Sequence, residues 1–429
     1  MSFVRKGIAV SGGQVLVTAL TVVSTIIFSR FLGREGVGQI EVARSTTTLV
    51  VTFVTLGLGN ASIYFINNQK MPVAAIVANS LKLGWIMTLL VTVGLSGSLL
   101  IFHDYFGNIS VPVAIFFSMG VGILAHFYLL RPVLIAKLAA RQMVMANAMN
   151  PIFLTTGTVL LAITGYLTPE LALVMISVGP FASFAWVLFY LRNDIDFSIP
   201  FDWLLVGKML SYGLKLAAVN ILMVLCSSLT VLLLRQLAST GFSEAGLYGR
   251  AVGICGLASF IPITMGPLLY SKWSGVTGEA RKSQVEMATR VHMTYASAVA
   301  IFLIFAGKYV LILLYGHEFA PAQYALRLLA IGTIFLSLVD VCTNLLASDG
   351  RIAVTAYILV GTLIVVVGTT YWAAPRWGSE GAAFGALCGN VFTAIASLLA
   401  CRSLYGIRIS RCLMVCQQDI RYMWKAVRG

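Results

Sequence analysis

The stretch Ser29–Arg44, SRFLGREGVGQIEVAR, lies between two long apolar runs and carries three arginines and two glutamates. A related string returns at Leu234–Arg250, LRQLASTGFSEAGLYGR, although the match between the two contains a gap. Each copy follows an apolar run, turns through glycines and ends with an arginine that opens another apolar run. A string that recurs in equivalent surroundings is typical of an internal repeat. We therefore predict two equivalent hairpin loops, one in each half of the chain, with the function located between the halves.

The composition is that of a membrane protein. Of the 429 residues, 59% are hydrophobic and only 10% are charged, and the mean hydropathy is +0.93. Soluble globular domains carry about 25% charged residues. A net charge of +14 would suggest a nucleic-acid partner in a soluble protein. In a membrane protein the cytoplasmic loops collect Lys and Arg, so we expect no nucleic-acid partner.

Twelve segments are apolar enough to cross a bilayer, each of about 20 residues or more. They are 8–29, 44–66, 74–101, 112–136, 144–165, 168–191, 209–234, 248–270, 291–315, 322–347, 352–372 and 381–404. The connectors between them are short, which excludes a separate soluble catalytic domain. The sequence therefore predicts an all-α membrane protein with twelve transmembrane helices.

Twelve spans divide into two lobes of six helices, 1–195 and 209–404, joined by a polar cytoplasmic linker at 196–208. With an even number of spans in each lobe, both lobes enter from the same side. Such repeats are related by a pseudo-two-fold axis along the membrane normal, which leaves a central cleft. The basic tail 405–429 is predicted to be an amphipathic helix on the cytoplasmic surface.

Two features inside the spans concern packing and bending. Gly381, Gly385 and Gly389 recur at every fourth residue, which predicts a small face for close helix contact. Pro262 and Pro267 flank a bend in the span 248–270. A proline bend in a membrane helix is either a static kink or a hinge that a transporter uses to open and close.

The distribution of Lys and Arg sets the orientation. Most basic residues of the connectors, and those near both chain ends, fall on one side. The opposite side holds Arg30, Arg34, Arg44, Arg235, Arg250 and Arg376. The positive-inside rule then places both termini in the cytoplasm. All but one of the outer arginines belong to the two repeated loops, so we expect another reason for their position.

The sequence shows no sign of catalysis, a cofactor or a metal. It contains no HExxH, GxSxG, P-loop or dinucleotide fingerprint. Its seven cysteines form no CxxC pair, and its four histidines lack the spacing of metal ligands. Without a nucleotide site, any pumping must draw on an ion gradient or on the gradient of the substrate. The chain is therefore not expected to be an enzyme.

Cations at membrane depth are the first candidate site residues, because a charge inside a span costs several kcal/mol unless it snorkels, pairs or faces water. Arg44 and Arg250 open spans on the outer side. They either pair structurally, for instance with Glu41, or line the cleft. Lys215 and Lys82 lie about two turns inside their spans. They either snorkel to the cytoplasmic surface or line the cleft.

The remaining candidates are Arg30, Arg34 and Arg235, which would draw an anion outward, and Asp340. Asp340 is the one clear carboxylate at membrane depth, and it either neutralises a cation or binds a proton or sodium ion. A water-filled cleft lined by Arg and Lys selects anions, since Arg binds phosphate in a bidentate manner. A transporter of organic cations would need carboxylates there. Because cations outnumber carboxylates among these candidate residues, the sequence predicts an anionic cargo.

Four motifs carry a resemblance to the multidrug/oligosaccharidyl-lipid/polysaccharide (MOP) exporter superfamily, and within it to bacterial O-antigen and polysaccharide flippases. They are SRFLGREGVGQI at 29–40, SEAGLYGRAVG at 243–253, LLASDGR at 345–351 and WGSEGAAFGALCGN at 377–390. Val37 departs from the family pattern, which usually has an aromatic residue there. The order and spacing of the motifs follow the family over nearly the whole chain.

The resemblance implies an inner-membrane transporter that turns an undecaprenyl-pyrophosphate-linked oligosaccharide from the inner to the outer leaflet for O-antigen or capsule assembly. It also implies alternating access between the two lobes. The expected partners are this lipid-linked glycan, the bilayer, a coupling ion (H+ or Na+) and other membrane proteins of polysaccharide assembly.

Two other functions compete with this interpretation. An ion-coupled multidrug antiporter of the same superfamily would carry acidic cation sites in its first lobe, and spans one to six hold no clear carboxylate at mid-membrane depth. A membrane glycan polymerase would carry a long external loop with polar and catalytic residues, and no connector is long enough.

The orientation is testable with reporter fusions. A periplasm-dependent reporter enzyme fused after Gly429 should be inactive, because the charge bias places both termini in the cytoplasm. The same reporter inserted in the 235–246 loop should be active. A strongly active fusion at Gly429 would contradict the topology.

Overall fold

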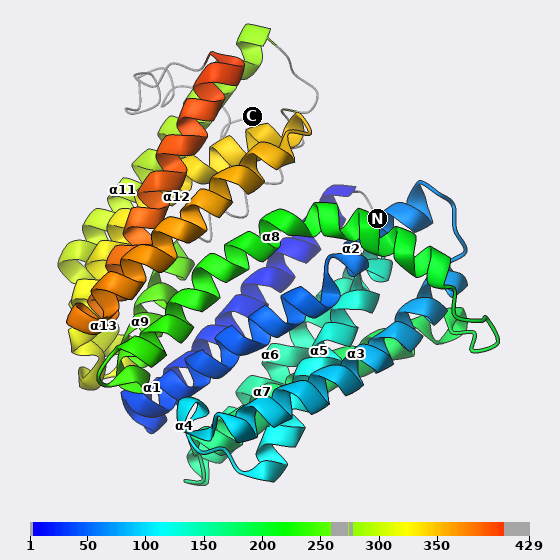
Figure 1. Cartoon of the computed structure of the whole chain (residues 1–429), viewed down its shortest axis with the longest axis horizontal. Helices are drawn as coiled ribbons and strands as arrows, with labels where there is room; N and C mark the ends of the chain where they lie inside the picture. The colour runs from blue at the N-terminus through cyan, green and yellow to red at the C-terminus, as the bar shows by residue number, and fades with distance from the viewer. Residues whose placement is uncertain (1–2, 259–272, 274–277, 407–429) are drawn as a thin grey trace. The chain divides into compact units, whose positions relative to one another are not determined.

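The computed structural model describes residues 3–258, 273 and 278–406, and every regular element within these residues is a helix (Figure 1). The chain divides into two compact units, Met1–Val224 and Leu225–Gly429. The predicted bend at Pro262 and Pro267 and the predicted tail helix from residue 407 onward lie outside the described residues.

Unit 1 contains the first seven α-helices, one short 3-10 helix and the beginning of an eighth α-helix. These are α1 (Phe3–Thr55), α2 (Leu58–Asn67), α3 (Val73–Ile101), α4 (His103–Phe106), α5 (Val111–Ala136), α6 (Ala140–Ile163), α7 (Pro169–Leu191), η1 (Arg192–Asp194) and α8 (Trp203–Leu237). One of its core clusters packs residues of α2, α3, α5, α6 and α7 with Leu205 and Met209 from the start of α8.

In its described residues, unit 2 contains the rest of α8 and four further α-helices with one 3-10 helix. These are α9 (Gly241–Ala258), α11 (Gly278–Tyr315), η2 (His317–Ala322), α12 (Gln323–Ser348) and α13 (Ile352–Tyr405). Within the described residues of both units, nine helices are long and apolar enough to cross a membrane. The chain is therefore an all-α, multi-pass membrane protein with two lobes.

The sequence predicts connecting loops at 30–43 and 373–380. Both predictions are wrong, because these segments are helical except at a single glycine. The chain stays helical on both sides of a single glycine: Gly33 in α1 has φ 63° and ψ −175°, and Gly378 in α13 has φ 53° and ψ −128°. Residues other than glycine rarely adopt a positive φ. Because one glycine breaks each helix, α1 and α13 each supply two arms (Figure 1). The two arms of α13 correspond to the predicted spans 352–372 and 381–404, whereas the predicted span 44–66 is divided between the second arm of α1 and α2.

The predicted small face of Gly381, Gly385 and Gly389 is confirmed. A Cβ added to any of the three would lie 2.2–2.4 Å from an atom of the other arm of α13. The contacted groups are Ala373, Thr370 and Val366, respectively. The two arms are further joined by a 2.6 Å hydrogen bond between the Thr362 and Thr393 hydroxyls. The three glycines thus let the arms of α13 pack almost backbone to backbone.

Two carboxylates cap helix ends, one in each unit. Glu170 accepts hydrogen bonds from the backbone nitrogen and the hydroxyl of Ser110, at 2.8 and 3.1 Å, just before α5 begins. Glu244 accepts from the backbone nitrogen of Ser379 at 2.6 Å, where the second arm of α13 begins. A negative charge satisfies the free N–H groups of a helix start. These carboxylates therefore serve the fold at helix ends.

The first part of α8 belongs to unit 1. Tyr212 stacks on Tyr64 with ring centroids 4.3 Å apart. Gly57 stands at the break between α1 and α2 with φ 72°, and a Cβ on it would lie 2.4 Å from the Gly213 carbonyl oxygen. The crossing of these helices therefore requires glycine on both sides, and α8 leaves unit 1 only after Val224.

The close packing in α13 leads to a stability prediction. Gly385→Val should lower the melting temperature of the purified protein by about 5 °C or more, because overpacking of a tight contact costs about 1–3 kcal/mol. Gly368→Val is the matched control in the same helix, since nothing lies within 4 Å of a Cβ there. Equal melting temperatures for the two variants would contradict the prediction, because they would show that the two arms of α13 can move apart at no cost in stability.

Candidate functional site

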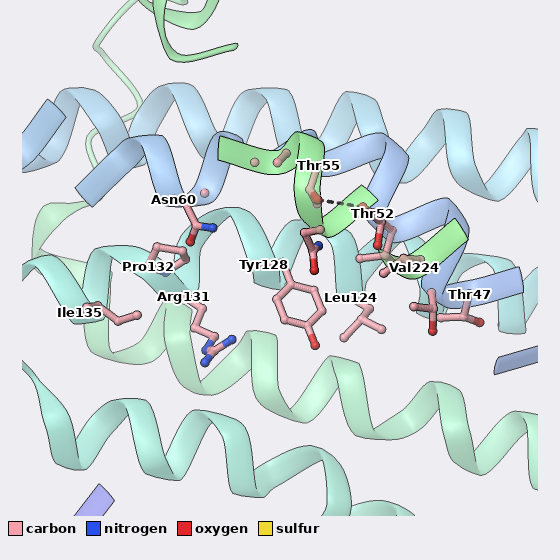
Figure 2. Close-up of a pocket in the computed structure, with 16 residues that line it drawn as sticks. Thr47, Thr52, Thr55, Asn60, Leu124, Tyr128, Arg131, Pro132, Ile135 and Val224 are labelled. Atoms are coloured by element: carbon pink, nitrogen blue, oxygen red, sulfur yellow. Dashed lines mark hydrogen bonds between the residues drawn. The ribbon is translucent and has the colours of Figure 1, made fainter. Parts of the chain in front are cut away.

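Two adjoining hollows lie in unit 1. The first, of about 470 Å³, lies between α1, α2, α5 and α8 (Figure 2). The second, of about 420 Å³, lies between α1, α5, α6 and α7. Both are lined by Thr47, Thr48, Leu124, Tyr128 and Arg131. We therefore treat the two hollows as one site and call it the unit-1 cavity.

One face of α5 supplies the central wall. Leu124, Tyr128, Arg131 and Ile135 follow each other at helical spacing, so they share one side of the helix. Figure 2 shows Leu124, Tyr128 and Arg131 projecting the same way from α5. The Arg131 guanidinium lies 6.0 Å from the centre of the Tyr128 ring. Its Nε is buried and has no hydrogen-bond partner among the described residues, which leaves this donor available.

A wall of threonines faces α5 from α1. The hydroxyls of Thr21, Thr47, Thr48 and Thr55 donate to carbonyls of their own helix at 2.8–2.9 Å. A hydroxyl that has given its proton to the backbone offers only lone pairs to a ligand. This wall therefore accepts hydrogen bonds and does not donate them. The carboxamides of Gln14, Asn60, Asn147, Asn150 and Asn220 add groups that do both.

The charge of the cavity is positive. Arg131 and Arg44 line it, and no Asp or Glu does so among the described residues. Arg44 lies 3.5 Å from Glu41, with 49% of its side chain exposed. An exposed pair at this distance holds the two charges together only weakly. Arg44 thus stands both beside Glu41 and on the cavity wall.

The other predicted cations of unit 1 lie elsewhere. Lys82 donates to the Ile199 carbonyl at 2.5 Å, while the Asn79 amide oxygen accepts from the Asp202 nitrogen at 2.7 Å. Both bonds attach the segment before α8 to α3. Lys215 is exposed on α8 and does not line the unit-1 cavity. Arg30 and Arg34 are exposed on either side of the kink in α1.

The linker segment has a local fold of its own. The Asp202 carboxylate accepts from the nitrogens of Leu204 and Leu205 at 2.9 and 3.0 Å, which caps the start of α8. Hydrogen bonds from the side chain and backbone of Ser198 hold the pKa of Asp196 below its usual range. Lys82 is therefore one of several polar groups that order residues 195–202.

In unit 2, the predicted cations are packed against aromatic rings. Arg250 is only 2% exposed, and its guanidinium lies 5.5 Å from the centre of the Tyr315 ring. Arg235 lies 3.9 Å from the centre of the Phe242 ring. Contacts of this kind hold a guanidinium in place. The equivalence of Arg44 and Arg250 in the repeat is thus accompanied by different surroundings, open for Arg44 and enclosed for Arg250.

Asp340 lies on α12 beside a very small cavity. Tyr295, Thr333 and Ser337 line this cavity with it. Its volume, about 10 Å³, corresponds to a single water molecule. The site has room for a proton or one small ion, and the coupling role of Asp340 stays a prediction.

Arg131 is the residue that the sequence interpretation missed as a site residue. The sequence interpretation counts it among the basic residues of the cytoplasmic side, at the end of the predicted span 112–136. Its spacing from Tyr128 and Leu124 is the signal that predicts a common face. In the structure, α5 ends at Ala136, where the predicted span ends, and Arg131 lines the cavity.

Comparison with known families accounts for the fold. Residues 3–267 match the family described as polysaccharide biosynthesis protein. The chain belongs to this family. No protein among the curated sequences matches the chain.

Solved structures of MOP-superfamily transporters share the fold. An inward-facing multidrug resistance MATE family transporter aligns with a TM-score of 0.73 at 16% identity, covering 90% of this chain and 94% of that one. The lipid II flippase MurJ in an inward closed conformation aligns with a TM-score of 0.72 at 11% identity, covering 92% and 87%. A MOP superfamily transporter from Pyrococcus furiosus, whose title notes a reverse polarity of its binding pocket, aligns at 0.66 with 18% identity, covering 93% and 94%.

These findings make the chain a member of the polysaccharide biosynthesis protein family that has the fold of MOP-superfamily transporters. Because all three structures are distant in sequence, they support the fold and leave the cargo open.

The position of Lys82 leads to a testable distinction. Lys82→Met should loosen residues 195–202 and increase trypsin cleavage after Arg192, because a charge-assisted hydrogen bond contributes roughly 1.5–3 kcal/mol. Lys215→Met removes the same charge from an exposed site and should leave the cleavage rate unchanged. Equal rates for both variants and the wild-type protein would contradict a role of Lys82 in ordering the segment.

Proposed function

We propose that this protein flips an undecaprenyl-pyrophosphate-linked oligosaccharide from the cytoplasmic to the periplasmic leaflet of a bacterial inner membrane, by alternating access between its two lobes, for O-antigen or capsule assembly. The observation that carries the proposal is the polarity of the unit-1 cavity: two arginines, a wall of hydrogen-bond acceptors and no carboxylate among its described lining residues. Membership of the polysaccharide biosynthesis family supports it.

The arginines suit the pyrophosphate. Arg131 has a buried Nε without a partner among the described residues, and Arg44 lies on the same cavity wall. Guanidinium groups bind phosphate oxygens through two parallel hydrogen bonds. A phosphate that carries no proton has nothing to donate to the threonine wall, so the anion would engage the arginines and avoid that wall. Arg30 and Arg34, exposed at the turn of α1, would extend the positive potential outward.

The threonine wall suits the glycan. Sugar hydroxyls are donors, and they meet acceptors in Thr21, Thr47, Thr48 and Thr55. The ring of Tyr128, which is 40% exposed, offers an apolar face for a sugar ring. The polyprenyl chain would remain in lipid, because its burial in a polar cavity would be unfavourable while sugars are too polar for hydrocarbon.

The competing functions fit the site less well. An antiporter for organic cations needs a negative group where the cation binds, whereas the described lining of the unit-1 cavity is positive. In unit 1, Glu170 caps α5 and Asp194 pairs with Lys137. A glycan polymerase would need catalytic side chains on a long external segment. The direct turns at Gly33 and Gly378 leave no such segment at these two places.

The proposal is tested on Arg131 and Arg44. The variants Arg131→Ala and Arg44→Ala should each weaken binding of undecaprenyl pyrophosphate to the purified protein by about ten-fold or more, because each removes a charge-assisted contact. The corresponding Arg→Lys variants should lose less, since the charge survives while the bidentate geometry is lost. Binding is measured by fluorescence quenching or native mass spectrometry.

Transport requires a second readout in cells. In a flippase-deficient strain, the double variant Arg44→Ala, Arg131→Ala should fail to restore surface polysaccharide although it reaches the membrane at normal levels. Arg141→Ala, an exposed arginine outside the cavity, is the matched control and should restore it. Full complementation by the double alanine variant would remove these two arginines from the mechanism.

A further inference from the structure

A second cavity, at one end of unit 2, is independent of the unit-1 cavity. It has a volume of about 420 Å³ and lies where α11 begins and where α12 and α13 end. Its lining residues are Gly278, Glu279, Arg281, Lys282, Val285, Leu345, Asp349, Arg351, Leu404 and Tyr405. We call it the α11–α13 pocket.

The pocket lies at one end of three helices that are long and apolar enough to cross a membrane. The candidate spans of these helices begin at Arg281, end at Ser348 and end at Tyr405, respectively. The polar lining residues of the pocket cluster at these same ends. A ligand in the pocket would therefore touch the boundary between hydrocarbon and water, where the phosphates of lipids are found.

Arg281 forms the rigid floor of the pocket. Its guanidinium donates to the Asp349 carboxylate at 2.7 Å and to the Ser348 hydroxyl at 2.6 Å, and it lies 5.6 Å from the centre of the Tyr405 ring. Only 11% of the side chain is exposed. The hydrogen bond from Arg281 holds the pKa of Asp349 below its usual range. Asp349 therefore stays ionised and balances the charge of Arg281.

Lys282 and Arg351 supply positive charge that is poorly balanced. Lys282 lies 3.5 Å from Glu279, but the Glu279 carboxylate is 89% exposed, so water screens the pair. Arg351 is exposed and follows directly after the end of α12. The pocket is lined by three cations, Arg281, Lys282 and Arg351, and by two carboxylates, Glu279 and Asp349, so it retains a net positive charge.

The remaining wall is apolar. Val285 and Leu345 are buried behind the charged groups, and Leu404 is 38% exposed at the side. A ligand that matches both parts carries an anionic group next to a hydrocarbon part. A free inorganic anion would use only the charged half of this surface, whereas a lipid would use both halves.

We propose that the α11–α13 pocket binds the headgroup of an anionic phospholipid, with the phosphate between Lys282 and Arg351 and the glycerol and first methylenes against Leu404. Arg281 acts as a positioning residue that holds α11 against the end of α12. The site does not rest on the proposed cargo, because it lies in unit 2 and shares no residue with the unit-1 cavity.

The test compares lipids on the full-length purified protein by native mass spectrometry. Phosphatidylglycerol should be retained, phosphatidylcholine should be retained at least five-fold less, and soluble glycerol phosphate should not compete at equal concentration. In the double variant Lys282→Gln, Arg351→Gln, the affinity for phosphatidylglycerol should fall by about ten-fold or more, as expected for the loss of a charge-assisted contact.

The matched control removes two charges from the same predicted face of the membrane. Lys70→Gln, Arg141→Gln alters two exposed residues of unit 1 and should retain phosphatidylglycerol as the wild-type protein does. Because Arg281 and Asp349 are unchanged, the pocket variant should keep its melting temperature in detergent, which separates lost binding from lost folding. Undiminished retention by the pocket variant, equal binding of phosphatidylcholine, or displacement by glycerol phosphate would each overturn the lipid site.

Discussion

The structure depends on one constraint: a backbone that crosses hydrocarbon must satisfy its N–H and C=O groups within its own segment. Each residue of loop at the membrane edge leaves polar groups without helical partners. The chain meets this constraint by confining two of its reversals to one glycine each, Gly33 and Gly378. Three helix starts are satisfied by side chains, namely those bonded by Glu170, Glu244 and Thr168.

The same constraint explains where the charged residues are. In unit 1, Lys82 donates a hydrogen bond to the carbonyl of Ile199, and Lys137 forms a salt bridge with Asp194 at 2.5 Å. In unit 2, Arg281 pairs with Asp349. Pairing with a neighbouring group lowers the free-energy cost of a charge near hydrocarbon, but a paired charge interacts less with a ligand. The functional candidates are therefore the cations whose pairing is incomplete, namely Arg131 and Arg44 in the unit-1 cavity and Lys282 and Arg351 in the α11–α13 pocket.

Features set by local periodicity were predictable from the sequence, whereas features set by distant residues were not. The spacing of Gly381, Gly385 and Gly389 predicts a packing face without knowledge of its partner, and the length of each apolar run predicts a span. The hydrogen bond from Lys82 joins residues 117 positions apart in the sequence. The depth of Lys82 within its span could not reveal this partner, so snorkelling and cleft lining were equal alternatives. The enclosure of Arg250 likewise depends on Tyr315 in another helix. Arg131 was missed because it was counted with the cytoplasmic charges, while its place on the cavity wall depends on the helices packed around α5.

Each of the two related strings ends with an arginine, Arg44 or Arg250, yet the two side chains have different surroundings. Arg44 extends into the unit-1 cavity between threonines that can only accept hydrogen bonds, whereas Arg250 is sealed beneath an aromatic ring. An enclosed guanidinium stabilises helix packing, and its desolvation makes it unavailable to a ligand unless the packing changes. An open guanidinium beside acceptors can bind an anion whose neighbouring groups are donors. A phosphate attached to sugars has this combination, which neither a drug cation nor a bare phosphate offers. The open surroundings of Arg44 therefore suit the proposed cargo, whereas the enclosed surroundings of Arg250 suit helix packing.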